Sequence, residues 1–154
     1  MDVALGGTFD PVHDGHRRLF ERAFELGDVT VGLTSDELAP KSRDVDRHVR
    51  SYDEREDALA TELESIAADY DREFEIRMLE SPTGIATEPK FDYLVVSPET
   101  REGGKRINEI RRENGHDPLE VVVVPHLLAD DGDIISSTRI VTGEIDEHGT
   151  VIDE

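Results

Sequence analysis

A chain of 154 residues is long enough to fold as one domain around its own core, and the absence of cysteine excludes disulfides, thiolate metal sites and thiol catalysis. Its 37 acidic residues outnumber 17 basic ones and give a formal net charge of −20, so the surface repels phosphate backbones and we expect no nucleic acid partner. No apolar run reaches the roughly 18 residues of a membrane span and the first residues carry no signal-peptide pattern, which favours a cytoplasmic protein without a membrane partner.

Apolar periodicity predicts strands and helices that follow one another along the chain. In chain order we expect a strand at 3–5, a helix at 19–26, a strand at 29–34, a helix at 51–70, strands at 74–79 and 92–97, a helix through 107–111, a strand at 119–125 and a helix from 136 to 143. The charged stretch 36–50 has little apolar content and is predicted to be a loop or short turns.

This order, with near-continuous apolar strands, is typical of a parallel sheet that is covered by helices on both faces. We therefore predict the doubly wound, Rossmann-like α/β class, with residues 1–154 as a single domain. The connection between the strands at 74–79 and 92–97 is only about a dozen residues long and fits this prediction least well. Ligands of such sheets bind outside the carboxyl ends of the strands, where strand order reverses.

The segment from Gly6 to His16 follows the first strand and has the features of a phosphate site. Gly6 and Gly7 allow a sharp turn and a close approach of a ligand to the main chain, and Thr8 adds a hydroxyl. His13 and His16 are three residues apart, so a helix that begins there carries both imidazoles on one side, at the end that favours an anion. The alternatives are a chance pair of histidines or a zinc site, although zinc lacks a suitable third ligand here.

A second candidate phosphate site lies at the start of the last predicted helix and consists of Ser136, Ser137, Thr138 and Arg139. Hydroxyls and a guanidinium suit phosphate oxygens, and an ordinary helix N-cap is the alternative. Asp130, Asp131 and Asp133 precede this site and would repel an anion. We expect these carboxylates to face away or to help hold a metal-bound species.

The two segments together resemble the motifs of the nucleotidylyltransferases that carry a histidine–any residue–glycine–histidine sequence. Gly7-Thr8-Phe9-Asp10-Pro11-Val12-His13-Asp14-Gly15-His16 matches their first motif, and Ile135-Ser136-Ser137-Thr138-Arg139 matches their second. Within that superfamily the chain is similar to the archaeal phosphopantetheine adenylyltransferases in Lys41, in residues 93–100 and in residues 143–146. The resemblance implies transfer of AMP from ATP to 4′-phosphopantetheine, which gives dephospho-coenzyme A and pyrophosphate in coenzyme A biosynthesis.

The resemblance also implies roles for individual residues. His16 and Thr8 would contact the α-phosphate of ATP, with His13 and Arg139 nearer the β- and γ-phosphates. Lys41 would bridge the attacking phosphate. Further contacts to the nucleotide are expected from Gly7, Glu99, Ser136, Ser137 and Thr138. A phosphate monoester can attack in line without a protein nucleophile, and Mg²⁺ is expected on the triphosphate with mostly water ligands and none from the protein.

The acceptor pocket is implied less fully, because residues 97–104 lack the glycine- and arginine-rich turn of the bacterial branch. The basic residues that could contact the acceptor are Lys41, Arg43, Arg47, Arg50 and Arg55, and a solvated charged loop is the alternative for the arginines. Nicotinamide mononucleotide, flavin mononucleotide or glycerol phosphate are alternative acceptors, and a non-catalytic nucleotide-binding module is the alternative class. We expect the histidines without a motif to be ordinary surface or loop residues, namely His48, His116, His126 and His148.

The acid-rich surface has only three lysines, Lys41, Lys90 and Lys105. Disorder is one explanation of such a composition, but the regular apolar segments favour adaptation to high salt, which screens the self-repulsion. The sequence shows no apolar patch that would set an oligomeric state, and we take the monomer as the expectation.

Overall fold

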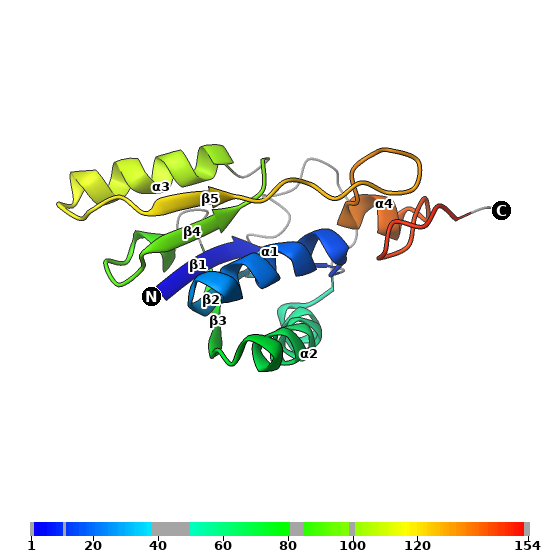
Figure 1. Cartoon of the computed structure of the whole chain (residues 1–154), viewed down its shortest axis with the longest axis horizontal. Helices are drawn as coiled ribbons and strands as arrows, with labels where there is room; N and C mark the ends of the chain where they lie inside the picture. The colour runs from blue at the N-terminus through cyan, green and yellow to red at the C-terminus, as the bar shows by residue number, and fades with distance from the viewer. Residues whose placement is uncertain (1, 11, 38–49, 81–84, 99–100, 153–154) are drawn as a thin grey trace.

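Five parallel strands form the centre of the computed structural model, which describes residues 2–10, 12–37, 50–80, 85–98 and 101–152 (Figure 1). The strands are β1 (Asp2–Gly7), β2 (Asp28–Thr34), β3 (Phe74–Leu79), β4 (Tyr93–Val96) and β5 (Glu120–Val123). They lie in the order β3-β2-β1-β4-β5, and every pairing is parallel. The strand order reverses beside β1, so the carboxyl end of β1 is the topological switch point at which ligands of this class bind.

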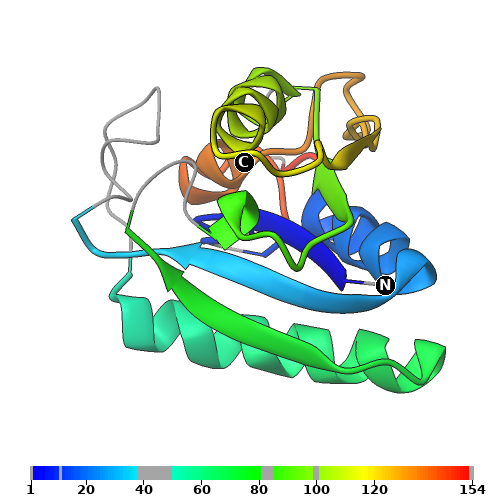
Figure 2. The same cartoon turned by 90° about the vertical axis from the view of Figure 1, so that its left-hand side faces the viewer.

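Helices cover both faces of the sheet, as the sequence predicts. They are α1 (Asp14–Leu26), α2 (Tyr52–Tyr70), α3 (Arg101–Glu113) and α4 (Ser137–Val141), with a short 3-10 helix η2 (Ile85–Thr87). Figure 2 shows α2 below strands β2 and β3 and places η2 and α3 above them. The doubly wound α/β prediction is confirmed, and α1 begins five residues before the apolar pattern does because its first turn is polar.

Strand β1 is buried on both of its faces. Val3 and Leu5 belong to the apolar cluster under α1 and α2, whereas Ala4 between them belongs to the cluster under α3 and η2. All three are at most 2 % exposed. A strand that is buried on both faces reads as a continuous apolar run, which is why the sequence predicts this strand so readily.

The connection from β3 to β4 carries the chain across two strands with a minimal crossover. Residues 85–87 form η2 in place of a full helix, and Ile85, Ala86 and Phe91 pack in the same cluster as Ala4. A parallel crossover needs about a dozen residues, and this one has little more. The prediction was weak here because an apolar turn this short has no helical periodicity.

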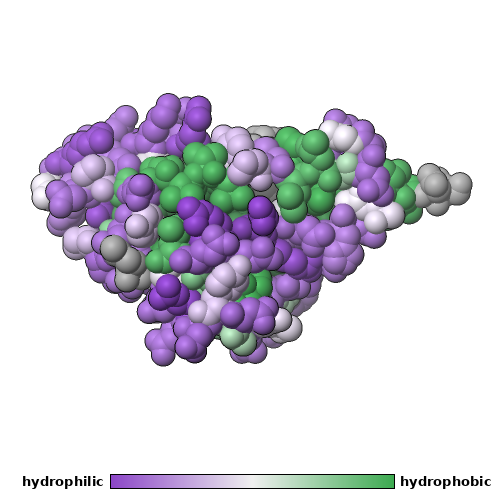
Figure 3. Space-filling model, viewed as in Figure 1, coloured by the Kyte–Doolittle hydropathy of each residue, from purple (hydrophilic) through white to green (hydrophobic). Residues whose placement is uncertain are grey.

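Hydrophilic residues cover most of the face in Figure 3, in keeping with the net charge. Among the described residues, no helix combines the length and the apolarity that a bilayer crossing requires. Apolar side chains are nevertheless exposed beyond β5, where Leu128 is 61 % exposed and Ile134 is 36 % exposed. The loop predicted at 36–50 falls largely on residues 38–49, which lie outside the described residues.

Candidate active site

The turn after β1 is shaped by Phe9. This residue has a φ of 49°, in the left-handed region, and its side chain is 4 % exposed. A Cβ on Gly7 would lie 2.9 Å from Cζ of the Phe9 ring, so glycine is needed there. This corrects the expected reason for Gly7: the space that its missing side chain leaves is filled by Phe9. The Phe9 ring also packs edge-on against His16, with the ring centroids 4.9 Å apart.

His13 and His16 cap the N-terminus of α1. The Nδ1 atom of His13 accepts hydrogen bonds from the backbone N–H groups of Gly15 (3.0 Å) and His16 (3.4 Å). The Nδ1 atom of His16 accepts one from the backbone N–H of His13 (3.3 Å). This is a reciprocal capping box in which two histidines take the places usually held by Ser or Thr and by Glu. The two rings are stacked with their centroids 3.7 Å apart, as a shared helix side predicts.

These hydrogen bonds fix the chemical form of both rings. An Nδ1 atom that accepts carries no proton, so each neutral ring bears its proton on Nε2. Burial, helped by the positive charge of Arg17, lowers the pKa of His13 to about 4. Burial also holds the pKa of His16 well below its usual value, with smaller effects from His13 and Arg17. At neutral pH the pair is therefore suited to donate two hydrogen bonds from Nε2 and not to act as a pair of cations.

Gly15 is required by the ring that caps the helix. A Cβ at this position would lie 2.8 Å from Cε1 and 2.9 Å from Nδ1 of His13. Such distances are shorter than real side-chain contacts, so an alanine would displace the imidazole from its cap. The glycine between the two histidines of the motif thus has a steric cause in this fold.

Thr8 lies between the end of β1 and the end of β2. Its Oγ1 atom is 2.9 Å from Oγ1 of Thr34, the last residue of β2. Oγ1 of Thr34 in turn accepts a hydrogen bond from Nη1 of Arg55 at 3.1 Å. The side chain of Arg55 is fully buried, so the alternative of a solvated charged loop is wrong for this arginine, and it does not face an acceptor either. Its place in the first turn of α2 gave no sequence signal of burial.

Arg50 is attached to the first motif by Asp10. The Asp10 carboxylate is 5 % exposed and accepts hydrogen bonds from the backbone N–H (2.9 Å) and from Nε (2.6 Å) of Arg50. The Arg50 side chain is 39 % exposed, so part of it faces solvent. This arrangement brings one of the arginines expected at the acceptor to the loop that holds Thr8, but its role toward an acceptor stays a prediction.

The second candidate segment forms the short helix α4. Oγ of Ser136 accepts a hydrogen bond from the backbone N–H of Arg139 at 3.2 Å, so Ser136 is the helix N-cap that was considered as the alternative. Ser137 is the first residue of α4, and Thr138 follows it, with a side chain outside the described part of the structure. Figure 1 places α4 beyond the carboxyl ends of β1 and β5, at the same end of the sheet as the start of α1.

Arg139 is held by acidic residues of its own segment. Its guanidinium pairs with the Asp131 carboxylate, donates to the backbone carbonyl of Ile134 (3.0 Å) and lies 3.4 Å from a Glu144 oxygen. The hydrogen bond that Arg139 donates to the Asp131 carboxylate raises the pKa of Arg139. The expectation that the aspartates preceding α4 face away is wrong for Asp131, because the Arg139 guanidinium attracts it, and the alternative that they help to hold a metal-bound species stays a prediction.

Known proteins resemble this chain in sequence and in fold. The cytidylyltransferase-like family matches residues 4–143. The chain belongs to this family. Phosphopantetheine adenylyltransferase of Methanosarcina acetivorans is 46% identical over 150 residues, covering 96% of this chain and 93% of the relative. The protein of the same name from Archaeoglobus fulgidus is 42% identical over 154 residues, covering 99% and 100%. A crystal structure of a protein with unknown function from Archaeoglobus fulgidus has a TM-score of 0.68 at 38% identity, covering 80% of this chain and 97% of that chain.

Two further histidines, His126 and His148, lie near the first motif, although we expected both to be ordinary surface or loop residues. His126, just beyond β5, is close enough to His13 to contribute to lowering its pKa. His148 lies 3.1 Å from the Asp14 carboxylate, and the backbone N–H of Asp14 donates to the carbonyl of Glu147 at 3.0 Å. The segment after α4 is thus attached to the start of α1. Contacts between residues 134 positions apart leave no local pattern in the sequence.

Three of the expected site residues fall outside the described residues, namely Lys41, Arg43 and Glu99. Arg47, weighed as a further acceptor contact, lies outside them too. Their roles stay as the resemblance implies them. Within the described ranges, no group of three or more His, Asp or Glu side chains is arranged to hold a metal ion.

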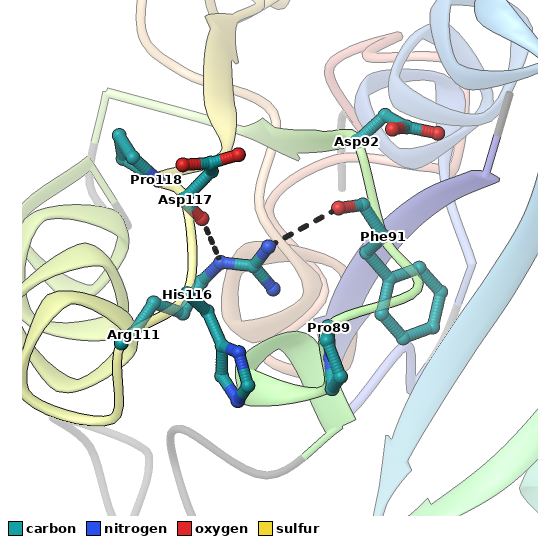
Figure 4. A pocket seen from close by; sticks show the side chains of 8 residues that line it. Pro89, Phe91, Asp92, Arg111, His116, Asp117 and Pro118 are labelled. Carbon is teal, nitrogen blue, oxygen red and sulfur yellow. Dashed lines mark hydrogen bonds between the residues drawn. The ribbon is translucent and has the colours of Figure 1, made fainter.

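A hollow of about 340 Å³ lies at the other end of the sheet, beside the amino ends of β4 and β5 (Figure 4). Arg111 on its wall is 3 % exposed and donates to the backbone carbonyls of Asp117 (2.7 Å), Glu88 (2.6 Å) and Phe91 (3.3 Å). Figure 4 shows this guanidinium pointing toward the Asp117 and Phe91 carbonyls, with His116 beside it. The arginine therefore fastens the crossover to α3, and the hollow is separate from the candidate active site.

Proposed function

We propose that this chain transfers AMP from ATP to 4′-phosphopantetheine and releases dephospho-coenzyme A and pyrophosphate. Two relatives that match nearly the full chain at 42–46% identity bear the name phosphopantetheine adenylyltransferase. The observation that carries the proposal is the pair of neutral histidines at the N-terminus of α1, beside the switch point of the sheet. Two Nε2–H donors and a helix N-terminus suit the phosphates of a nucleotide.

The chemistry asks the protein for position and charge stabilisation. The acceptor's phosphate oxygen attacks the α-phosphorus of ATP, a P–O bond forms, and the bond to the pyrophosphate leaving group breaks. A phosphate monoester is already ionised near neutral pH, so no general base is needed. His16 and Thr8 would donate to the α-phosphate, where charge develops in the transition state. Neutral donors are adequate for this, and the lowered histidine pKa values keep them neutral.

Arg139 and His13 would contact the β- and γ-phosphates, with Ser136, Ser137 and Thr138 beside them. Because Asp131 pairs with Arg139 in this structure, binding of the triphosphate would compete with that carboxylate for the guanidinium. Lys41, Arg43 and Arg50 would contact the acceptor's phosphate, and Gly7 and Glu99 the nucleotide. Mg²⁺ would be held by the triphosphate and water, where it offsets phosphate charge. We propose the cytoplasm as the location and a monomer as the working state.

Pyrophosphate release tests the acceptor directly. The protein is incubated with ATP, Mg²⁺ and one acceptor at a time in high salt: 4′-phosphopantetheine, nicotinamide mononucleotide, flavin mononucleotide, or glycerol phosphate with CTP. We expect release with ATP and 4′-phosphopantetheine and at most traces with the others. Release with another acceptor alone would keep the transfer chemistry and refute the acceptor. No release with any of them, together with measurable ATP binding, would favour the non-catalytic module.

A further inference from the structure

Arg55 joins α2 to the ends of both strands that border the candidate site. Its Nε atom donates to the carbonyl of Arg50 (2.9 Å), and Nη2 lies 3.2 Å from the Asp36 carboxylate. Its Nη1 atom donates to Oγ1 of Thr34 (3.1 Å) and, more weakly, to the carbonyl of Thr8 (3.4 Å). The side chain is 0 % exposed, so Arg55 does not contact a substrate itself.

The direction of the hydrogen bonds follows from the chemistry of the donors. A guanidinium can only donate, so the Thr34 oxygen must be the acceptor toward Arg55. Thr34 is 3 % exposed, and its own hydroxyl proton therefore needs an acceptor within the protein. Oγ1 of Thr8 lies 2.9 Å away and can accept it. A Thr8 oxygen that accepts from Thr34 directs its own proton elsewhere.

We propose that Arg55 is a positioning residue that acts through Thr34 to orient the Thr8 hydroxyl as a donor toward the phosphate that reacts. The inference rests on the proposed function, because it takes Thr8 to contact the α-phosphate. The relay Arg55–Thr34–Thr8 sets the direction of one hydroxyl before substrate binds. A donor that is already oriented gains strength in the transition state without a reorganisation cost.

The test compares Thr34→Val with Thr34→Ser, a pair that differs in the hydroxyl. Valine has the shape of threonine and keeps the buried packing, but it neither accepts from Arg55 nor donates to Thr8. We expect Thr34→Val to lower kcat about fivefold to tenfold, the size of one oriented hydrogen bond, with the KM for 4′-phosphopantetheine unchanged. Thr34→Ser keeps the hydroxyl and should retain most of the wild-type kcat. Equal loss of kcat in both variants, or a kcat of Thr34→Val equal to wild type, would overturn the relay.

Double variants place Arg55 in the same chain of bonds. Thr8→Val should lower kcat more than Thr34→Val does. Adding Thr34→Val to Thr8→Val should lower kcat no further, because the Thr8 hydroxyl that Thr34 orients is then absent. Arg55→Lys should likewise add no loss in the Thr34→Val background. Losses that multiply in either double variant would show independent roles and overturn the proposal. Thermal unfolding of each variant establishes whether it folds. If Arg55→Lys does not fold, the comparison of the Thr8 and Thr34 single and double variants still tests the proposal.

ATP affinity, measured by calorimetry without an acceptor, separates this proposal from the proposed function. If wild type releases pyrophosphate with another acceptor, the same kcat comparison is made with that acceptor. If wild type binds ATP but transfers nothing, the relay still predicts non-additive losses of ATP affinity for Thr8→Val and Thr34→Val, and additive losses overturn it. A wild-type chain that binds no ATP overturns the site and the relay together.

Discussion

The imidazole rings of His13 and His16 stack 3.7 Å apart at the start of α1, and each accepts a backbone N–H of that turn through Nδ1. Because Nδ1 is used for capping, the helix start and the ligand-binding chemistry depend on the same two side chains. The capping bonds hold the rings in the tautomer that donates from Nε2. The following predictions test this arrangement and its surroundings.

Neither histidine should titrate near neutral pH. Burial lowers the pKa of His13 to about 4 and lowers that of His16 well below 6.5. We expect ¹⁵N NMR of the imidazoles to show the Nε2–H tautomer for both rings, unchanged from pH 8 to pH 6, with His13 beginning to change only as the pH approaches 4. His148 serves as an internal control, because the Asp14 carboxylate raises its pKa above 6.5. A midpoint near 6.5 for His13 would contradict the buried capping role.

The same shift makes stability depend on pH. Between pH 6.5 and about 4 the unfolded chain binds a proton at His13 that the folded chain does not, so stability is full above pH 6.5 and falls as the pH drops through this window. The loss due to His13 is on the order of 3 kcal/mol. His13→Asn keeps a side-chain acceptor at the N-cap but does not titrate. Denaturant unfolding at pH 7 and pH 4 measures the free energy of unfolding of both proteins. Between these pH values it should fall by that much more in wild type than in His13→Asn, and an equal fall in both would refute the prediction.

Two helical glycines should respond oppositely to alanine. Gly15→Ala places a Cβ 2.8 Å from the His13 ring, so we expect the free energy of unfolding to fall by about 1–3 kcal/mol and adenylyl transfer to fall with it. Gly103→Ala, in α3, meets nothing within 4 Å and should raise the free energy of unfolding by about 0.5–1 kcal/mol through helix propensity. Chemical denaturation measures both. A stabilising Gly15→Ala would show that the His13 ring does not need this space.

Asp131 should compete with ATP for Arg139. Removing its charge by Asp131→Asn keeps the shape of the side chain and frees the guanidinium, so we expect the KM for ATP to fall by about twofold to fivefold. Asp133→Asn removes the same charge from the same loop and is the matched control, with a smaller change expected. The measurement is steady-state pyrophosphate release against ATP concentration. A higher KM for ATP in Asp131→Asn would mean that the carboxylate positions Arg139 for binding.

Salt should stabilise the fold. With a net charge of −20, screening of like charges favours the compact state, and this is the basis of the proposed adaptation to high salt. We expect Tm to rise steadily as KCl is raised from 0.1 M to 0.5 M, a range in which the screening length shortens by about half. A chloride salt is used because sulfate would also strengthen apolar burial. A Tm that is highest at the lowest ionic strength would contradict the idea.

The sequence predicts the sheet and its main helices because their apolar residues are regularly spaced. Val3 to Leu5 is buried on both faces and appears as an unbroken apolar stretch. Val29, Val31 and Leu33 alternate with Thr30 and Gly32 in a strand that is buried from Val29 to Thr34. The order of the strands is harder to predict from the sequence, because the crossover through η2 carries no helical periodicity. The first motif was found from its residue types, but its capping geometry was not, because histidine is an unusual N-cap.

Other parts of the site depend on contacts that the sequence does not display. Arg55 stands in a charged stretch and looks solvated, yet its side chain is fully buried against Thr34 at the end of β2 and reaches the exposed Asp36 in the turn that follows. Arg139 looks available to an anion, yet Asp131 pairs with it. In both cases a long cationic side chain reaches partners that the chain brings close only after folding.

The most direct test of the site is the rate of pyrophosphate release by His16→Ala with ATP and 4′-phosphopantetheine. His116→Ala, beside the hollow at the amino ends of the strands, is the matched control, and thermal unfolding establishes that both variants fold. If His16 donates to the α-phosphate in the transition state, kcat should fall by about a hundredfold or more in His16→Ala and remain at the wild-type value in His116→Ala. Full turnover by a folded His16→Ala variant would contradict the proposed active site.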